Sequence, residues 1–166
     1  MLRLCTFVFA LCCVLALTTV GAAWPDPKTE PKKGEFKLTA EELAVIDLTN
    51  AERAKGEKKL PALKMNPKLM DAARKHAANM AAQEKMDHVL DEKNPADRAK
   101  AAGYKYRGLG ENIAAGQETP KDVVKAWMDS PPHRENIMKG EYLEVGVAVV
   151  KSKTGDRYWV QVFGKQ

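Results

Sequence analysis

The stretch VGVAVVKSKTGDRYWVQVF, residues 145–163, carries the clearest signal for the fold of this chain. Two runs that are rich in β-branched and aromatic residues, 145–150 and 158–163, flank a turn at Thr154, Gly155 and Asp156. This pattern predicts an antiparallel β-hairpin, because such residues favour strands and a short Gly-containing link can join them.

The part of the chain before the hairpin carries mostly helical signals. Thr39, with Glu42 three residues later, is a capping-box signature, and it predicts a helix that ends at Gly56. Asn66 followed by Pro67 is a typical start for a second helix. Helices first and a hairpin last indicate an α+β fold, with helices packed on an antiparallel sheet. Shorter elements are expected elsewhere: helices over 95–102, 119–130 and 133–138, an extended connection over 60–65, and a loop with a short strand over 110–116.

The N-terminal residues are expected to lie outside the folded domain. Residues 1–23 have the pattern of a signal peptide, since Arg3 precedes an apolar run and small residues follow it up to Ala23. A retained N-terminal anchor is the alternative, although the run is short for a membrane span. Residues 24–37 are rich in proline and charge and predict an extended tether. We therefore expect a folded domain over 38–166 in a secreted or extracytoplasmic protein of the periplasm or cell envelope, with no stable membrane span after cleavage.

All three cysteines, Cys5, Cys12 and Cys13, fall within the predicted signal peptide. A mature chain without thiols has no disulfide, no cysteine nucleophile and no cysteine metal ligand, so its stability must come from its core. The net charge is +5, and basic residues are scattered among acidic ones. Nucleic-acid-binding proteins usually gather positive charge on one face, so nucleic acid is not an expected partner. Weak attraction to anionic polymers or membranes is compatible with this charge.

The three histidines and one glutamate are the first candidates for chemistry. His76 falls on the apolar stripe of its helix, where a buried, hydrogen-bonded core histidine is expected. His88 and His133 follow the ends of helices, where side chains commonly face clefts. Glu111 adjoins an apolar run and is either a satisfied structural partner or a site acid. No metal-binding motif is present, but two neutral imidazoles and a carboxylate would form an open zinc-like set if the fold brought them together.

Ser130 is a further candidate, since it stands three residues before His133 and serine is scarce after the signal segment. A nucleophilic set of Ser130, His133 and Glu111 is conceivable. The simpler interpretation is that Ser130 caps the helix end or the following turn, because no strained turn of the nucleophile-elbow type surrounds it.

A series of motifs, taken in order, resembles the CAP superfamily of cysteine-rich secretory, antigen 5 and pathogenesis-related 1 proteins, in its bacterial, cysteine-poor SCP-like branch. The resemblance covers about residues 43–163. It implies a three-layer α-β-α sandwich with a central antiparallel sheet and a surface cleft. The motifs are TNAERAKG (49–56), LMDAARKHAANMA (69–81), MDH (86–88), GENIA (110–114), WMDSPPHRENI (127–137), VGV (145–147) and YWVQVF (158–163).

The resemblance also implies a site. In the family the cleft is lined by two His and two Glu, and in several members the two His hold zinc. By motif, His88 and His133 correspond to the two histidines, so they are the candidate ligands for zinc or another divalent cation, and Glu111 corresponds to the first acid. Ser130 stands where the second acid would be, so one acid is missing. Metal binding should therefore be weaker, and it should fade below about pH 6, where imidazole becomes protonated.

Two functions of different kinds fit this pattern. The first is a non-enzymatic extracellular binding module for a lipid or sterol, a cell-envelope component or a divalent cation, which the missing acid and the absent nucleophile elbow favour. The alternative is a hydrolase, such as a peptidase, that uses Glu111 and His133 with zinc-bound water or with Ser130. A third interpretation is that these residues only stabilise the fold through hydrogen bonds.

Overall fold

The structure is a computed structural model that describes residues 37–56 and 58–166. The predicted signal peptide with its three cysteines, and the predicted tether up to residue 36, lie outside the described residues. Within the described part of the chain, no helix combines the length and apolar character that a membrane span requires.

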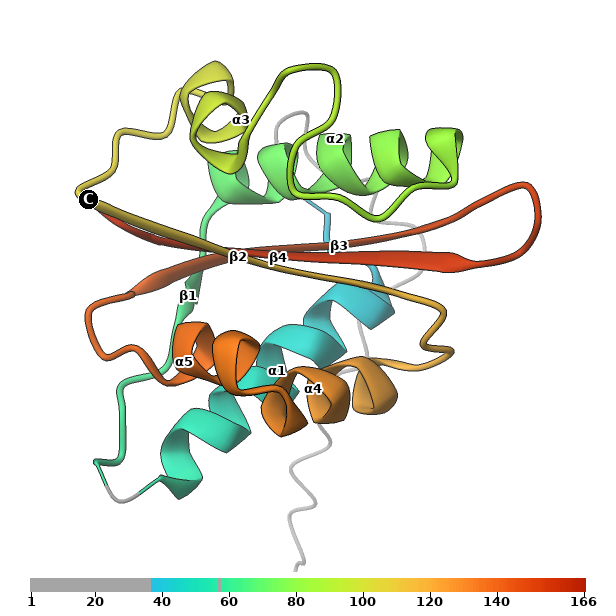
Figure 1. The fold of residues 1–166 in the computed structure, drawn as a ribbon. Coiled ribbons are helices and arrows are strands. Elements are labelled where there is room, and N and C mark those ends of the chain that lie inside the picture. The colour runs from blue at the N-terminus through green and yellow to red at the C-terminus, as the bar shows by residue number, and fades with distance from the viewer. Residues whose placement is uncertain (1–36, 57) are drawn as a thin grey trace, which may run out of the picture. The chain divides into compact units, whose positions relative to one another are not determined.

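The described residues form helices and strands that are interspersed along the chain (Figure 1). The predicted capping box at Thr39 is confirmed, and so is the Asn66 cap before Pro67. Each satisfies backbone N–H groups that the first turn of a helix leaves unpaired. The elements in order are α1 (Ala40–Lys55), β1 (Lys64–Met65), α2 (Pro67–Gln83), α3 (Pro95–Ala101), β2 (Gly108–Ala115), α4 (Pro120–Asp129), α5 (Pro131–Met138), β3 (Glu144–Lys151) and β4 (Arg157–Lys165).

The sheet has the strand order β1-β3-β4-β2. The predicted C-terminal hairpin is confirmed as β3 and β4, which pair in antiparallel register from Glu144 opposite Gly164 to Lys151 opposite Arg157. The short strand expected over 110–116 is instead an eight-residue edge strand, β2, that pairs antiparallel with β4 along its whole length. Its glycines, alanines and asparagine are poor strand formers, so pairing with β4, and not local propensity, sets its length.

The central sheet differs from the expectation in one detail. Its three long strands are antiparallel as predicted, but β1 pairs with β3 in parallel over two residues. The sequence predicts only an extended connection between α1 and α2. In the structure this connection pairs with the outer edge of β3, so that its backbone N–H and C=O groups are hydrogen-bonded.

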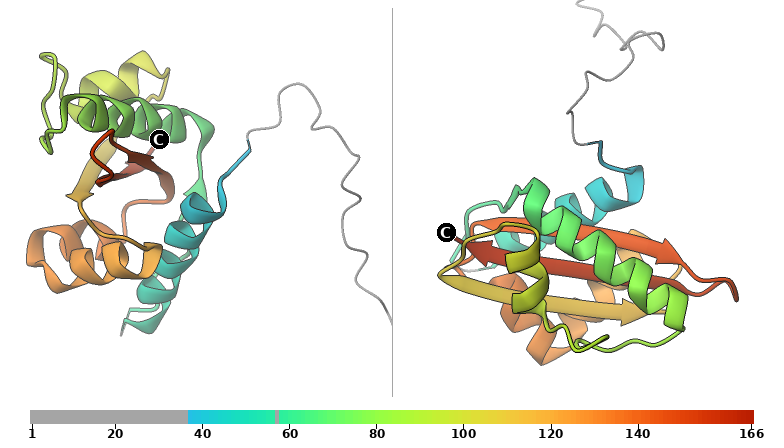
Figure 2. Two further views of the ribbon diagram at one scale, coloured as in Figure 1. Left: turned by 90° about the vertical axis from the view of Figure 1, so that its right-hand side faces the viewer. Right: turned by 90° about the horizontal axis from the view of Figure 1, so that it is seen from above.

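The predicted three-layer α-β-α sandwich is confirmed. Helices α2 and α3 cover one face of the sheet, and α1, α4 and α5 cover the other (Figures 1 and 2). Each face has its own apolar core, with Leu69, Met80 and Val160 on the α2 side and Trp127 and Trp159 on the α1 side.

Two contacts fix these layers closely. Gly146 of β3 lies directly under α2, where an added Cβ would come within 2.1 Å of the Leu69 carbonyl carbon. On the other face, Arg53 of α1 is fully buried and its guanidinium donates to four backbone carbonyls, one in α5 and two in the segment that follows it. The bonds join Nε to Pro61 O (3.1 Å), Nη1 to Ile137 O (2.6 Å) and Lys139 O (3.1 Å), and Nη2 to Tyr142 O (3.2 Å). Arg53 thereby holds α5, which carries His133.

Candidate functional site

The candidate residues gather around the edge strand β2. Side chains alternate between the two faces of a strand. Ile113 belongs to the core on the α2 side and Ala114 to the core on the α1 side, so Glu111 faces α2 and α3 whereas Asn112 faces α4 and α5. Because β2 has no neighbour on its outer side, elements from both helical layers meet there. We name His88, Glu111, Ser130 and His133 together the edge site.

Glu111 is the centre of a buried ionic network. Its side chain is only 2% exposed, yet both carboxylate oxygens have partners. Oε1 accepts from Nδ1 of His88 at 2.8 Å, and Oε2 accepts from Nη2 of Arg98 at 2.7 Å. A carboxylate buried in this way needs such neutralisation, because transfer of an unpaired charge out of water is costly.

Arg98 is a member of this network that the sequence analysis missed. It lies on the short helix α3, which begins after a capping box formed by Asn94 and Asp97. Besides its bond to Glu111, its Nη1 donates to the carbonyls of His88 at 3.1 Å and Lys93 at 2.7 Å. It therefore holds the loop that carries His88 against the strand that carries Glu111. Nothing in the local sequence distinguishes this arginine from the many exposed basic residues.

His76 belongs to the same neighbourhood, from the side of α2. It is buried as predicted, at 1% exposure, but within the described residues neither ring nitrogen has a hydrogen-bond partner at normal geometry. A contact with the Asp87 backbone acts on its pKa as a hydrogen bond does, and Nε2 lies 3.8 Å from Oε1 of Glu111. Burial lowers the pKa of His76, and the negative charge of Glu111 offsets part of that effect. His76 is therefore a neutral ring at neutral pH that packs beside the buried carboxylate.

Ser130 and His133 form the second half of the edge site. Nδ1 of His133 lies 2.9 Å from Oγ of Ser130, a distance that fits a hydrogen bond. Ser130 stands at the junction of α4 and α5 and caps the end of α4 as predicted, through its backbone N–H, whereas its side chain makes no capping hydrogen bond to α5. The His133 carbonyl accepts from Nδ2 of Asn112 at 3.1 Å, which joins α5 to β2 beside Glu111.

The glycine of the GEN motif allows α5 to approach β2. A Cβ at Gly110 would lie 2.9 Å from Oδ1 of Asn136 and 2.7 Å from the hydroxyl of Tyr142. With that space free, Nδ2 of Asn136 donates to Oδ1 of Asn112 at 2.9 Å. The motif therefore places Glu111 on one face of β2 and anchors the His133 helix on the other.

The electrostatics show that the two histidines of the edge site lie in one neighbourhood. The pKa of His133 is lowered chiefly by burial and secondarily by the positive charge that His88 carries when protonated. No hydrogen bond or ion pair joins Glu111 to His133 or to Ser130 within residues 37–56 and 58–166. Glu111 is therefore coupled to His88, and His133 is coupled to Ser130.

The donor atoms set limits on any metal centre. Among the described residues, no group of three or more His, Cys, Asp or Glu side chains is placed to hold a metal ion. Since Nδ1 of His88 and Nδ1 of His133 are both occupied, each ring keeps only its Nε2 for a ligand. The edge site can thus offer two imidazole nitrogens, whereas catalytic zinc sites commonly have three protein ligands.

Comparisons with known proteins agree with this architecture. The model of the cysteine-rich secretory protein family, CAP, matches residues 46–163. YkwD, an uncharacterized protein of Bacillus subtilis, is 39% identical over 127 residues, which are 76% of this chain and 48% of YkwD. YlbC, an uncharacterized membrane protein of the same organism, is 27% identical over 143 residues, or 86% of this chain and 39% of YlbC. This chain thus spans half or less of the length of these relatives.

Solved structures with the same fold include extracellular and surface proteins. An extracellular protein of Bacillus anthracis that contains an SCP domain superposes with a TM-score of 0.69 at 23% identity, over 80% of this chain and 45% of that one. An outer surface protein of Borrelia burgdorferi superposes with a TM-score of 0.65 at 25% identity, over 74% of this chain and 92% of that one. The family model covers most of the folded residues, and the sandwich matches these structures. The chain therefore belongs to the cysteine-rich secretory protein (CAP) family.

Proposed function

We propose that this protein is an exported, non-enzymatic binding module whose edge site holds its ligand through His88 and His133. The observation that carries the proposal is the state of Glu111. Its two oxygens are occupied by His88 and Arg98 and its side chain is buried. A carboxylate in that position orients an imidazole, and its burial keeps it away from the solvent water that a general base would activate.

A divalent cation such as zinc is the ligand that this donor set supports best. A carboxylate accepts hydrogen bonds, so the bond to Glu111 places a proton on Nδ1 of His88 and leaves Nε2 for a ligand. Burial lowers the pKa of His133, which favours the neutral ring that metal ligation requires. His88 and His133 would hold the ion, with Glu111 and Ser130 orienting them, and the ion would supply Lewis-acid binding of a further ligand. A lipid, sterol or cell-envelope component that binds at this site would meet the same two imidazoles as hydrogen-bonding groups.

One observation favours the alternative, a hydrolase. The hydrogen bond between Ser130 and His133 has the geometry of a nucleophile with its base. A working triad also needs an acid on the other nitrogen of the base, and the only carboxylate of the edge site is committed to His88 and Arg98. The serine–histidine pair therefore lacks the third member that would orient the imidazole.

The test combines zinc titration with a peptide-cleavage assay on the purified protein. We expect calorimetry to show zinc binding that H88N and H133N each abolish, and we expect no cleavage by any variant. Ser130→Ala has a matched control in Ser152→Ala, an exchange in the hairpin. Cleavage that S130A and H133N abolish but S152A does not would establish the hydrolase instead. No zinc binding, with a lower melting temperature in H88N and H133N, would leave only the architectural role.

Export is the second part of the proposal. It is supported by the signal-like pattern of residues 1–23 and by the extracellular and surface location stated for the two structural relatives. Expression of the full chain in a bacterial host, followed by mass measurement of the protein outside the cytoplasm, tests it. Loss of about the first 23 residues is expected. Retention of the intact chain in the membrane would support the anchor alternative.

A further inference from the structure

The turn between α3 and β2 carries an uncompensated positive charge beside aromatic rings. The segment RAKAAGYKYR, residues 98–107, contains four basic residues and two tyrosines, and no acidic residue occurs between Asp97 and Glu111. Arg98 is used in the buried network of the edge site. Lys100, Lys105 and Arg107 form no ion pair within the described residues, so their charge is available on the surface.

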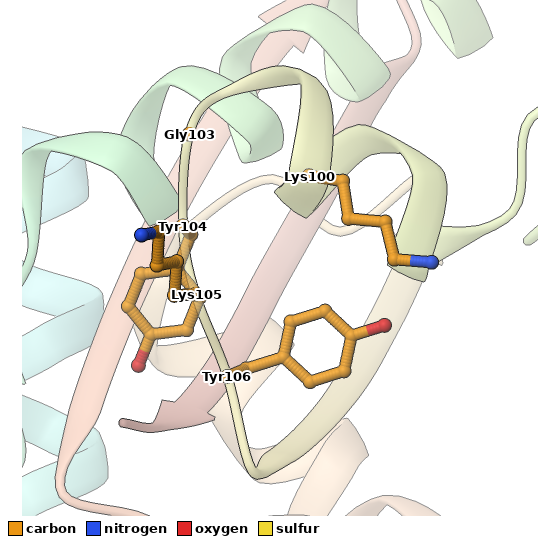
Figure 3. A pocket seen from close by; sticks show the side chains of 5 residues that line it. All are labelled: Lys100, Gly103, Tyr104, Lys105 and Tyr106. Carbon is orange, nitrogen blue, oxygen red and sulfur yellow. The ribbon is translucent and has the colours of Figure 1, made fainter.

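A hollow of about 490 Å³ lies at this turn and is lined by Lys100, Gly103, Tyr104, Lys105 and Tyr106 (Figure 3). The volume falls within the range of small-molecule sites, roughly 300–1,000 Å³. Figure 3 shows the side chains of Lys100 and Tyr106 extending toward the same side, so that an ammonium group and a phenol ring flank the same space. We name these five residues the turn pocket.

The wall of the turn pocket is fixed before any ligand arrives. Tyr104 is 1% exposed, and its hydroxyl donates to Oε2 of Glu144 at 2.6 Å. It packs against Gly164, where an added Cβ would come within 2.3 Å of the Tyr104 hydroxyl. The turn itself is closed by the Tyr104 N–H, which donates to the Ala99 carbonyl at 2.9 Å, and by Gly103 at φ +74°. A preformed pocket loses little entropy on binding.

We propose that the turn pocket binds a sugar ring that carries a phosphate or carboxylate, as in an anionic glycopolymer. The apolar face of a sugar can lie on the ring of Tyr106, as flat apolar groups do on aromatic side chains. The ammonium group of Lys100 can pair with the anionic substituent, as lysines do at phosphate sites, whereas the Lys105 side chain extends to the other side, beside Tyr104 (Figure 3). An aromatic ring alone or a lysine alone would fit many ligands. A molecule that combines a sugar ring with an anionic group can contact both the tyrosine and the lysine.

The chemistry of the surroundings argues against two other anionic partners. A membrane surface is usually engaged by exposed apolar side chains next to basic ones. The large apolar side chains that are exposed within the described residues, Leu43, Met86, Val89 and Leu143, do not line the turn pocket. A single-stranded nucleic acid requires several aromatic platforms along a basic groove, and here one hollow is lined by one fully buried and one half-buried tyrosine.

The turn pocket is also separate from the edge site. Arg98 and Lys100 are two positions apart on α3, so they point to nearly opposite sides of the helix. Arg98 reaches Glu111, whereas Lys100 lines the turn pocket. The inference therefore does not depend on zinc binding or on the function proposed for His88 and His133.

The test is an amide NMR titration of the purified protein with N-acetylglucosamine 1-phosphate, compared with N-acetylglucosamine and inorganic phosphate. The sugar phosphate should shift the amides of the turn pocket and bind about tenfold more tightly than either fragment, because only it uses both the ring and the charges. A glycan polymer with the same phosphates should bind more tightly still if polymers are the source of the ligand. If the polymer and the free sugar phosphate bind with equal affinity per sugar unit, the ligand of the turn pocket is a free sugar phosphate.

Variants separate specific binding from general charge attraction. K100Q should weaken binding of the sugar phosphate by about tenfold without a change in melting temperature, and Y106L should independently weaken it by a similar factor. K153Q removes the same charge from the distant hairpin and should leave affinity unchanged. The proposal is overturned if K153Q weakens binding as much as K100Q. Shifts that gather elsewhere, or tighter binding of anionic vesicles or single-stranded DNA at the turn pocket, would overturn it as well.

Discussion

Replacement of Arg98 with Met should show how strongly the edge site depends on its buried ion pair. The change keeps most of the side-chain volume but removes three hydrogen bonds, one to Glu111 and two to backbone carbonyls. Glu111, at 2% exposure, would then keep only His88, whose side chain is 48% exposed. Breaking a buried pair by removal of one partner costs about 3–5 kcal/mol. Because His88 still donates a hydrogen bond to one oxygen, we expect a loss of about 3 kcal/mol in the free energy of unfolding.

Urea denaturation of a double-mutant cycle measures this directly. E111Q removes the charge, so R98M/E111Q no longer buries an unpaired carboxylate. The double variant should therefore be more stable than the sum of the two single changes predicts, by about 1–3 kcal/mol. R107M is the matched control, since Arg107 is exposed and forms no ion pair within the described residues, and it should change stability by no more than about 0.5 kcal/mol. A cost of R98M below about 1 kcal/mol, or strict additivity in the cycle, would refute the argument.

Three further expectations concern the scaffold. R53M should lower the free energy of unfolding in urea by about 3 kcal/mol or more, because buried carbonyls lose their donor, and a loss under about 1 kcal/mol would contradict this. Gly146→Ala should abolish the cooperative thermal transition, since its Cβ would meet the α2 backbone, whereas Gly140→Ala should fold, because there a Cβ meets only a flexible side chain. Burial lowers the pKa of His76, so the stabilising contribution of its neutral form is complete above about pH 6.5 and is lost as the pH falls through its folded pKa. Unfolding free energies between about pH 7 and pH 5 should therefore fall more steeply for the wild type than for H76F, and equal slopes would count against the buried neutral ring.

Local signals were sufficient to predict an α+β fold with helices packed on an antiparallel sheet, and the family resemblance supplied the three-layer arrangement. Caps at Thr39 and Asn66 and the β-branched runs of the hairpin act within a few residues, so each could be identified from neighbouring positions. The length of β2 and the parallel pairing of β1 could not be predicted, because both depend on partners that are distant in sequence. Pairing with β4 and β3 overrides the weak strand propensity of these segments.

The candidate site also has features that could be predicted from the sequence and features that could not. The family resemblance selected His88, Glu111 and His133, and the structure places them around one strand edge, with Glu111 against His88 and His133 against Ser130. Their role in binding stays a prediction. The resemblance did not point to Arg98, whose importance arises only when α3 packs onto β2. It also did not show that the buried ring of His76 has no hydrogen bond of normal geometry within the described residues, because that depends on how the loop after α2 folds back.

The central claim is that His88 and His133 bind through their Nε2 atoms while their Nδ1 atoms stay in hydrogen bonds. Long-range nitrogen–proton NMR of the histidine rings during a zinc titration tests it most directly, since each ring nitrogen has its own resonance. We expect the Nε2 signals of His88 and His133 to shift together, their Nδ1 atoms to remain protonated, and His76 to be unaffected. Zinc-induced shifts at Nδ1, shifts at His76 alone, or no shift in any ring would contradict the account.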